Sequence, residues 1–219
     1  MDHPDLYTAF MRLSGFVLYG PSGTGKTRVA EAIANTLNMK FFVVSMSQVL
    51  DMWQGNSEKM VKTLYAVAGR EKRALIFFDE GEKFFGKRTG NKANQNSIDG
   101  IQSTLLTCMN GFGKEYAGVV TACATNLPQE IDDAFLSRFE PKYEVSLPTL
   151  KGRKDIFNIL LGRKFEDVRN NISDEDLSRL AAATDGYSGR DLEKVCKFAA
   201  RAATDSYVVD LESHPEREG

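Results

Sequence analysis

The stretch Gly20-Pro21-Ser22-Gly23-Thr24-Gly25-Lys26-Thr27 matches the phosphate-binding pattern G-x-x-x-x-G-K-[ST] at every position. The apolar run before it predicts a buried strand over residues 16–19, and apolar residues at helical spacing after it predict a helix over residues 28–37. The glycines allow a tight turn whose N–H groups face a phosphate, at the positive end of the helix dipole. A chance glycine-rich turn before a helix is the alternative, and the full match in this context argues against it. We therefore predict that Lys26 contacts the phosphates and that the Thr27 hydroxyl serves Mg²⁺.

The composition is typical of a soluble globular protein, with 219 residues, 42% hydrophobic residues, 26% charged residues and a net charge of −2. This charge gives no reason to expect a nucleic-acid partner. The three cysteines, Cys108, Cys123 and Cys196, match no metal or redox spacing, so we expect reduced core residues. No apolar run reaches the roughly 18–20 residues of a membrane span, and the first residues do not resemble a signal peptide. We therefore expect a cytoplasmic protein without membrane insertion.

Apolar runs alternate with helical patterns up to about residue 150. Strands are predicted over residues 16–19, 41–44, 74–78, 119–124 and 143–147, and helices over 28–37, 57–70 and 98–109, with a polar loop over 86–96. This alternation favours a parallel sheet with helices on both faces, the arrangement of α/β proteins. After Pro148 only helices are predicted, over residues 154–161, 174–183 and 189–203. We therefore predict an α/β domain over residues 1–150 and a small all-helical domain over residues 151–219.

A second motif ends the third predicted strand. Four apolar residues, Leu75–Phe78, are followed by Asp79 and Glu80, which is the Walker B pattern. Ligands of such sheets bind at the carboxyl ends of the strands. An acid at this position can hold Mg²⁺ directly or through a water molecule, and the next acid can orient and polarise an attacking water. Together with the phosphate loop, this pattern predicts a hydrolytic nucleotide site.

Further segments resemble the AAA family of ATPases. They occur in the family's order and are the first pore loop (Met52–Lys59), sensor 1 (Ala124–Asn126), the second region of homology (Ile131–Phe139) and the start of the lid helix near the adenine (Gly186–Leu192). The details are most similar to the branch that contains katanin, spastin, fidgetin and the ESCRT-disassembly ATPase. The resemblance implies a P-loop AAA+ domain with a parallel five-stranded sheet between helices, followed by a helical lid.

The resemblance also implies the role of each site residue. Lys26 binds the phosphates of ATP, Thr27 and Asp79 serve Mg²⁺ (Asp79 directly or through water), and Glu80 positions and activates the attacking water. Gly81 departs from the pattern, because the family usually has an apolar residue there. A glycine is expected to loosen the backbone beside Glu80, at a local cost of about 0.5–1 kcal/mol.

Two residues after the fourth strand receive family roles as well. Asn126 is expected to help hold the water and to sense the γ-phosphate, whereas the alternative is an Asn that caps the turn before Pro128. Arg138 is expected to be an arginine finger that reaches the ATP of a neighbouring subunit, whereas the alternative is a surface Arg on a short loop. Ser137 stands where this branch often has another arginine, so trans-activation is expected to be weaker.

The lid-helix start contributes Gly189 and Arg190 to the expected cofactor-binding set. Most close relatives have a small residue at the position of Arg190. Two interpretations therefore stay open: Arg190 is a sensor 2 arginine that contacts the nucleotide, as in more distant AAA+ relatives, or it is a surface residue at a helix start.

The resemblance places Met52, Trp53 and Gln54 in a pore loop that grips an extended polypeptide, whereas an ordinary packing role for Trp53 is the alternative. Met52 replaces the basic residue that usually precedes the aromatic. A nearby basic cluster can compensate for this change, or it can be a solvated charged face; its members are Lys83, Lys87, Arg88 and Lys92.

The implied function is that of an ATP- and Mg²⁺-dependent motor that forms a homo-hexamer and pulls polypeptide through its pore, with tubulin tails or ESCRT subunits as substrates. A nucleotide-binding regulatory subunit with little turnover and a general AAA unfoldase are the alternatives. The family's upstream segment over the adenine, its further C-terminal helix and a recruiting domain are not evident. A fragment, a reduced protein and an incomplete gene model each explain this.

Overall fold

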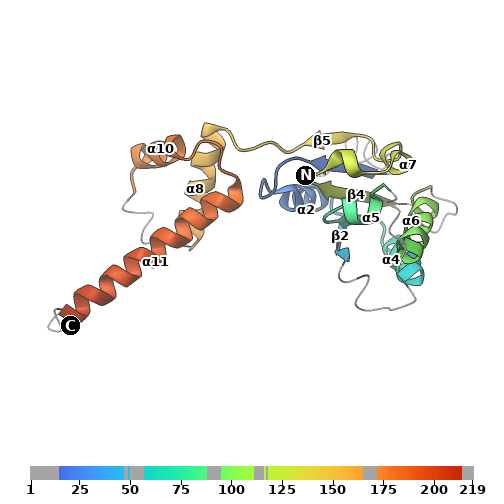
Figure 1. The fold of residues 1–219 in the computed structure, drawn as a ribbon, viewed down its shortest axis with the longest axis horizontal. Coiled ribbons are helices and arrows are strands. Elements are labelled where there is room, and N and C mark those ends of the chain that lie inside the picture. The colour runs from blue at the N-terminus through green and yellow to red at the C-terminus, as the bar shows by residue number, and fades with distance from the viewer. Residues whose placement is uncertain are drawn as a thin grey trace. The chain divides into compact units, whose positions relative to one another are not determined.

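The structure is a computed structural model that describes residues 15–46, 49, 57–87, 95–110, 116, 118–164 and 172–213. The chain divides into two compact units (Figure 1). The first contains Met1–Gly20 and Lys26–Val145, and the second contains Pro21–Gly25 and Ser146–Gly219. Most of the phosphate loop therefore groups with the helical second unit, which the sequence did not predict.

The first unit is built on a five-stranded sheet in the order β2-β3-β4-β1-β5, and each neighbouring pair is parallel. The strands are β1 Gly15–Tyr19, β2 Lys40–Val44, β3 Ala74–Phe78, β4 Val119–Thr125 and β5 Lys142–Glu144. The prediction of a parallel five-stranded sheet is confirmed. Because all strands run the same way, the residues that follow β1, β3 and β4 lie at one edge of the sheet.

The predicted fifth strand was wrong in its bounds, because β5 starts at Lys142 and ends at Glu144 instead of running from 143 to 147. The Val145 N–H still donates to the Tyr19 carbonyl at 2.7 Å. The chain then leaves this edge of the sheet, since the second unit begins at Ser146. The apolar pattern of residues 143–147 extends beyond Glu144, the last residue of β5 that pairs with β1, so the sequence placed the end of the strand too late.

Among the described residues, the first unit has six helical segments: α2 Lys26–Thr36, α4 Ser57–Gly69, α5 Glu82–Phe85, α6 Gln95–Met109, the 3₁₀ turn η2 Pro128–Glu130, and α7 Asp133–Leu136. The three longest match predicted helices, although α6 begins inside the predicted polar loop. The short segments α5, η2 and α7 were not predicted, because one turn is too short for an apolar period. Within the described ranges, no helix combines the length and the hydropathy that a membrane span needs.

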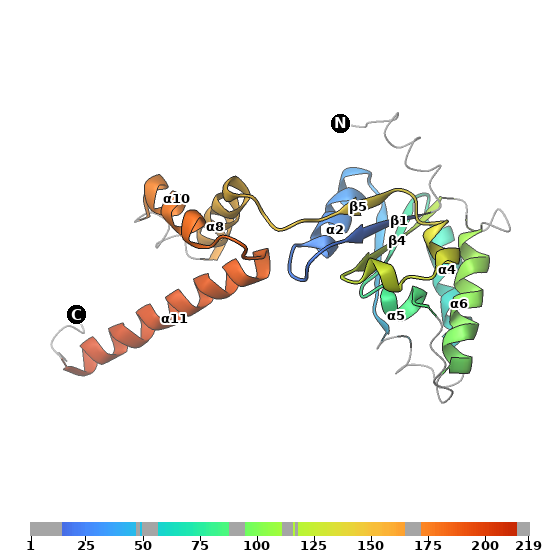
Figure 2. The ribbon, with the colours of Figure 1, turned by 45° about the horizontal axis from the view of Figure 1, so that its top comes forward.

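Helices cover both faces of the sheet, with the buried residues of α2 on one face and those of α4, α5, α6 and α7 on the other. Successive side chains of β1 point to opposite faces of the sheet: Phe16 and Leu18 pack with α2, whereas Val17 packs on the other face. Helices α4 and α6 lie side by side in both views (Figures 1 and 2). The three cysteines are buried and in the reduced form, as predicted.

An aromatic cluster fixes α5 directly behind the acids that end β3. The Phe85 ring lies 5.1 Å from the Phe78 ring, 4.9 Å from that of Phe135 and 5.0 Å from that of Phe139, each with near edge-to-face geometry. Such pairs stabilise beyond the area that they bury. The turn Asp79–Gly81 is therefore held between a central strand and a tightly packed helix.

The second unit contains α8 Leu150–Lys164, α10 Asp174–Ala183 and α11 Gly189–Ser213. The last helix continues to Ser213, beyond the predicted end at residue 203. Helix α8 packs against both α10 and α11, around a core that includes Phe157, Leu177 and Leu192.

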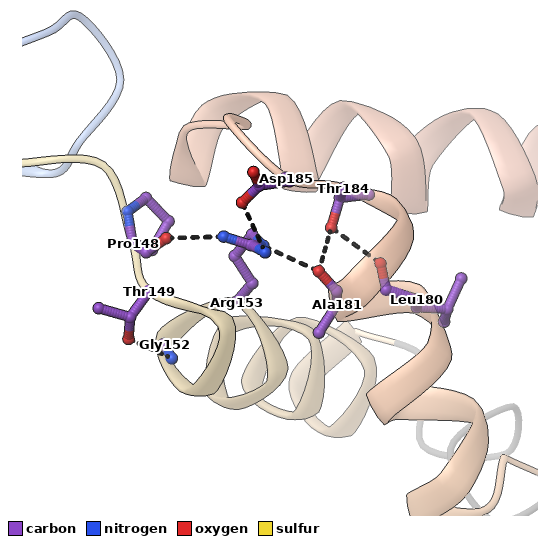
Figure 3. Close-up of polar contacts among 8 residues, drawn as sticks. All are labelled: Pro148, Thr149, Gly152, Arg153, Leu180, Ala181, Thr184 and Asp185. Carbon is purple, nitrogen blue, oxygen red and sulfur yellow. Dashed lines mark hydrogen bonds and ion pairs between the residues drawn. The ribbon is translucent and has the colours of Figure 1, made fainter.

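Arg153 joins the segments of this helical unit (Figure 3). Its side chain is only 5% exposed. The guanidinium donates to the carbonyl of Ala181 at 2.9 Å and to that of Pro148 at 3.0 Å, and it pairs with the Asp185 carboxylate at 2.9 Å. These contacts satisfy carbonyls at the end of α10 and before α8.

Candidate active site

The phosphate loop begins at Gly20, where only a glycine fits. Its φ of +141° lies in a region that other residues rarely adopt. A Cβ atom there would also lie 2.4 Å from the Val145 carbonyl oxygen. The Gly20 N–H donates to the Thr125 carbonyl at 3.3 Å, which ties the loop entrance to the end of β4.

Lys26 opens α2, and its side chain is buried, with 9% exposed. The ammonium group donates to the Gly20 carbonyl at 2.8 Å and to Asn126 Oδ1 at 2.7 Å. Both of these acceptors are neutral. Lys26 and Asn126 are 100 positions apart and were predicted for the site on separate grounds. The fold brings their polar atoms into direct contact.

The alternative role of Asn126, capping the turn before Pro128, belongs to its neighbour. The Leu127 N–H donates to Thr125 Oγ1 at 3.0 Å. The Asn126 side chain instead accepts from Lys26. The sequence reasoning missed Thr125, whose hydroxyl also donates to Glu82 Oε2 at 2.6 Å.

Asp79 and Glu80 follow β3 in a sharp turn. Asp79 Oδ1 accepts from the Glu80 N–H at 3.1 Å, and Glu80 has a φ of +55°, which is unusual for a residue with a side chain. The Glu80 carboxylate forms an ion pair with Lys83, the cationic partner one turn along α5. Hydrogen bonding to Glu80, and then its negative charge, raise the pKa of Lys83. The sequence grouped Lys83 with a basic surface cluster and did not predict this pair.

Gly81 is packed rather than loose, contrary to the expectation from its lack of a side chain. Its backbone is helical, with φ −54° and ψ −28°, and its N–H donates to the Ala124 carbonyl at 2.7 Å. A Cβ atom on Gly81 would lie 3.0 Å from both Cβ and Sγ of Cys123. The thiol of Cys123 is fully buried, and this burial raises its pKa. The missing side chain therefore lets the turn after β3 approach β4 closely.

Arg138 follows α7 and contacts its own subunit. Its Nε donates to Asn110 Oδ1 at 2.7 Å, and its NH1 donates to the Ala134 carbonyl and to Ser137 Oγ, the latter at 3.4 Å. Asn110 was not predicted for the site. The role of Arg138 at a neighbouring subunit stays a prediction.

The start of α11 contacts residues of the phosphate loop inside the second unit. The Arg190 N–H donates to the Gly23 carbonyl at 3.2 Å, and its guanidinium donates to Ser22 Oγ at 3.3 Å. Gly189 begins the helix. Ser188 Oγ and the Asp191 carboxylate cap it, since each accepts from the other's N–H, at 3.3 and 3.2 Å. Arg190 is thus in contact with the loop, whereas its contact with nucleotide stays a prediction.

The predicted pore-loop residues Met52, Trp53 and Gln54 lie outside the described residues, as do Arg88 and Lys92 of the basic cluster.

The residues at the sheet edge fit a nucleotide with Mg²⁺. In the described part of the chain, no group of three or more His, Cys, Asp or Glu side chains could hold a metal by itself. Mg²⁺ usually binds through one or two carboxylates together with waters and substrate phosphates. Thr27, in the first turn of α2, and Asp79, after β3, supply the oxygen ligands that such a site needs.

Comparison with known families agrees with this geometry. Residues 16–147 match the model of the ATPase family associated with various cellular activities (AAA), and residues 174–208 match that of the AAA+ lid domain. The chain belongs to the AAA family. Its sheet and its helical unit are accordingly an AAA domain and its lid.

Two of the known proteins that this AAA chain resembles come from the predicted branch. It is 36% identical over 216 residues to "Fidgetin-like protein 1" of Drosophila melanogaster, covering 96% of this chain and 40% of the relative. It is 36% identical over 215 residues to a katanin p60-like ATPase of Xenopus tropicalis, covering 97% of this chain and 40% of that relative. A crystal structure of the FIGL-1 AAA domain in complex with ADP is similar with a TM-score of 0.76 and 31% identity, over 91% of this chain and 64% of that one. The chain thus spans less than half the length of these curated relatives.

Proposed function

We propose that this AAA chain is the ATP-hydrolysing part of a Mg²⁺-dependent, ring-forming motor that remodels protein assemblies. The observation that carries the proposal is the contact between Lys26 Nζ and Asn126 Oδ1 at 2.7 Å. It joins the phosphate-loop lysine to the residue that follows β4, and the neighbouring strand β3 is followed by Asp79 and Glu80. The ADP complex of the FIGL-1 AAA domain supports nucleotide binding by this fold.

The residues divide the work of phosphoryl transfer, which is mainly positioning and electrostatic stabilisation. Lys26 offers a positive charge to the β- and γ-phosphates. Thr27 and Asp79 hold Mg²⁺, which supplies charge neutralisation at the phosphates when it is bound. Glu80 accepts a proton from the attacking water, and Asn126 orients that water from the end of the neighbouring strand β4. In this proposal, Gly189 and Arg190 contribute to nucleotide binding, as the resemblance to the family implies.

The site is completed by a second copy of the chain. In the assembled homo-hexamer, Arg138 leaves its contacts with Asn110 and Ala134 and stabilises charge on the neighbouring ATP. Met52, Trp53 and Gln54 grip an extended polypeptide in the central pore. We propose cytoplasmic microtubule severing, with acidic tubulin tails as substrate, or disassembly of ESCRT filaments, because fidgetin-like, katanin-like and Vacuolar protein sorting-associated protein 4 relatives match at 34–36% identity.

A mixing experiment tests the shared site. Glu80→Gln disables the chain's own site but leaves its Arg138, whereas Arg138→Ala leaves the chain's own site but removes the finger. Each variant alone should lose at least about ten-fold in ATP turnover. A mixture should regain activity, because an intact Arg138 then faces an intact Glu80 at some interfaces.

Arg201→Ala is the matched control, because Arg201 is an exposed arginine on α11. It should leave turnover unchanged. Full activity of Arg138→Ala alone would contradict the finger assignment. Failure of the mixture to recover, when sedimentation shows mixed rings, would contradict the shared site. Wild-type chains that bind ATP without turnover would favour the regulatory-subunit alternative.

A further inference from the structure

Two hydrogen bonds join the segment after β3 to the end of β4. One connects the backbones, from the Gly81 N–H to the Ala124 carbonyl at 2.7 Å. The other connects side chains, from Thr125 Oγ1 to Glu82 Oε2 at 2.6 Å. Each turn carries one residue of the proposed reaction, Glu80 on the first and Asn126 on the second. Through its bond to Thr125, Glu82 can therefore fix the position of Asn126 relative to that of Glu80.

Thr125 is the centre of this connection. Its side chain is buried, with 1% of the residue exposed. Its hydroxyl donates to Glu82 and accepts from the Leu127 N–H at 3.0 Å, while its carbonyl accepts from the Gly20 N–H at 3.3 Å. A hydroxyl has a single proton to donate, so the carboxylate of Glu82 fixes the direction of that proton. The lone pair that receives the Leu127 N–H is fixed with it.

The consequence falls on Asn126, the residue between Thr125 and Leu127. The bond between its two neighbours closes the turn around Asn126, whose Oδ1 accepts from Lys26 at 2.7 Å. We propose that Glu82 is a positioning residue that, through the Thr125 hydroxyl, holds Asn126 in register with Lys26 and Glu80. This inference rests on the proposed function, since it assigns a role in the same reaction.

A simpler role for Glu82 is local stabilisation of α5. Glu82 is the first residue of that helix, where any acid interacts favourably with the helix dipole. The two roles differ in what they require of the side chain. The dipole needs the negative charge, whereas the bond to Thr125 needs an acceptor oxygen at the end of the side chain. Glu82→Gln keeps the oxygen and removes the charge.

The test compares Glu82→Ala, Glu82→Gln, Thr125→Val and the Ala–Val double variant in the full chain. Glu82→Ala and Thr125→Val should each lower kcat about ten-fold with little change in the KM for ATP, because misplaced groups act on the transition state. The double variant should be no slower than Thr125→Val alone. Glu82→Gln should retain most of the wild-type kcat. Glu175→Ala, which removes an exposed acid from the first turn of α10, is the control and should behave as wild type.

A second measurement does not need turnover. In chains that carry Glu80→Gln, the affinities for fluorescent ATP and ADP analogues are compared with and without Glu82→Ala. The change should lower the preference for ATP over ADP about five-fold, since the proposed function has Asn126 contact the γ-phosphate, and should leave ADP affinity unchanged.

The inference is overturned if Glu82→Ala lowers only the melting temperature and leaves kcat and the ATP preference as in the wild type. It is also overturned if Glu82→Gln is as slow as Glu82→Ala, because charge and not the hydrogen bond would then matter. Wild-type binding without hydrolysis would contradict the proposed function alone, and the affinity ratio would still decide the role of Glu82. A wild-type chain that binds no nucleotide contradicts both.

Discussion

Adding one methyl group at Gly81 tests whether the turn that carries Glu80 is packed or loose. The Ala Cβ would lie 3.0 Å from Cβ and Sγ of Cys123 and 3.2 Å from the Ala124 carbonyl oxygen. All three contacts are tight for a carbon atom, and the strand β4 beneath is central in the sheet. The turn therefore has to move by a few tenths of an ångström, rather than the strand.

Two opposing effects set the magnitude of Gly81→Ala. Overpacking of a well-packed site costs about 1–3 kcal/mol. Because Gly81 already has helical backbone angles, the change also restricts the unfolded chain, which stabilises by about 0.4–1 kcal/mol. Overpacking wins, and the free energy of unfolding should fall by about 0.5–2 kcal/mol. Moving Glu80 by a few tenths of an ångström should lower kcat by about three- to ten-fold, because a misplacement of about 1 Å lowers the rate on the order of a hundred-fold.

The assay combines denaturant unfolding with phosphate release at saturating ATP. Gly162→Ala in α8 is the matched control, because a Cβ there would meet nothing within 4 Å. It should stabilise by up to about 1 kcal/mol through helix propensity and leave kcat unchanged. Adding Cys123→Ala to Gly81→Ala removes the Sγ contact and should restore part of the lost turnover. If Gly81→Ala stabilises the chain and raises kcat, the turn is loose and the packing argument is refuted.

Three further predictions concern contacts outside this turn. Tyr65→Phe removes the 2.7 Å hydrogen bond to the buried Thr121 hydroxyl and should lower the free energy of unfolding, measured by denaturant titration, by about 1–3 kcal/mol. Adding Thr121→Val to this variant should recover most of the loss, and a double variant that loses the sum of the two single losses would contradict a direct bond. Arg153→Met leaves the Ala181 and Pro148 carbonyls without their donor and should cost about 2–3 kcal/mol, seen as an earlier thermal transition; an unchanged transition would contradict this role. Lys83→Met removes the cation that pairs with Glu80 and should raise kcat about two-fold at low ionic strength. High salt should abolish this difference because it screens exposed ion pairs, and an equal gain in kcat at all salt concentrations would exclude the ion pair as the cause.

Much of the fold follows from local patterns in the sequence. The four strands β1 to β4 are apolar runs, and the long helices have apolar residues at helical spacing, so both the strands and their parallel direction could be predicted, but not their order in the sheet. Lys26, Asp79 and Glu80 could be predicted as site residues because their motifs are contiguous. Asn126 could be assigned only through the family resemblance, and its contact with Lys26 decides against a turn-capping role.

The contacts that were missed join residues far apart in the sequence. Thr125 and Glu82 are 43 positions apart, and Arg138 and Asn110 are 28 apart. Neither hydrophobic periodicity nor a local motif predicts such hydrogen bonds, because each bond depends on how two distant segments come together in the folded chain. At Gly81, the sequence was likewise not enough to predict the packing. Its lack of a side chain suggested a loose backbone, and only the neighbouring Cys123 reveals that the space is filled.

The order of the strands explains why the turn after β4 is central to the site. Strand β4 lies between β3 and β1, so its end has Gly20, which follows β1, on one side and the acids that follow β3 on the other. The hydrogen bonds follow this order: the Thr125 carbonyl accepts from Gly20, while the Ala124 carbonyl accepts from Gly81. A change in either flanking turn therefore reaches Asn126 through one backbone contact. Since an edge strand has only one neighbour, no residue after β2 or β5 could connect both halves of the site.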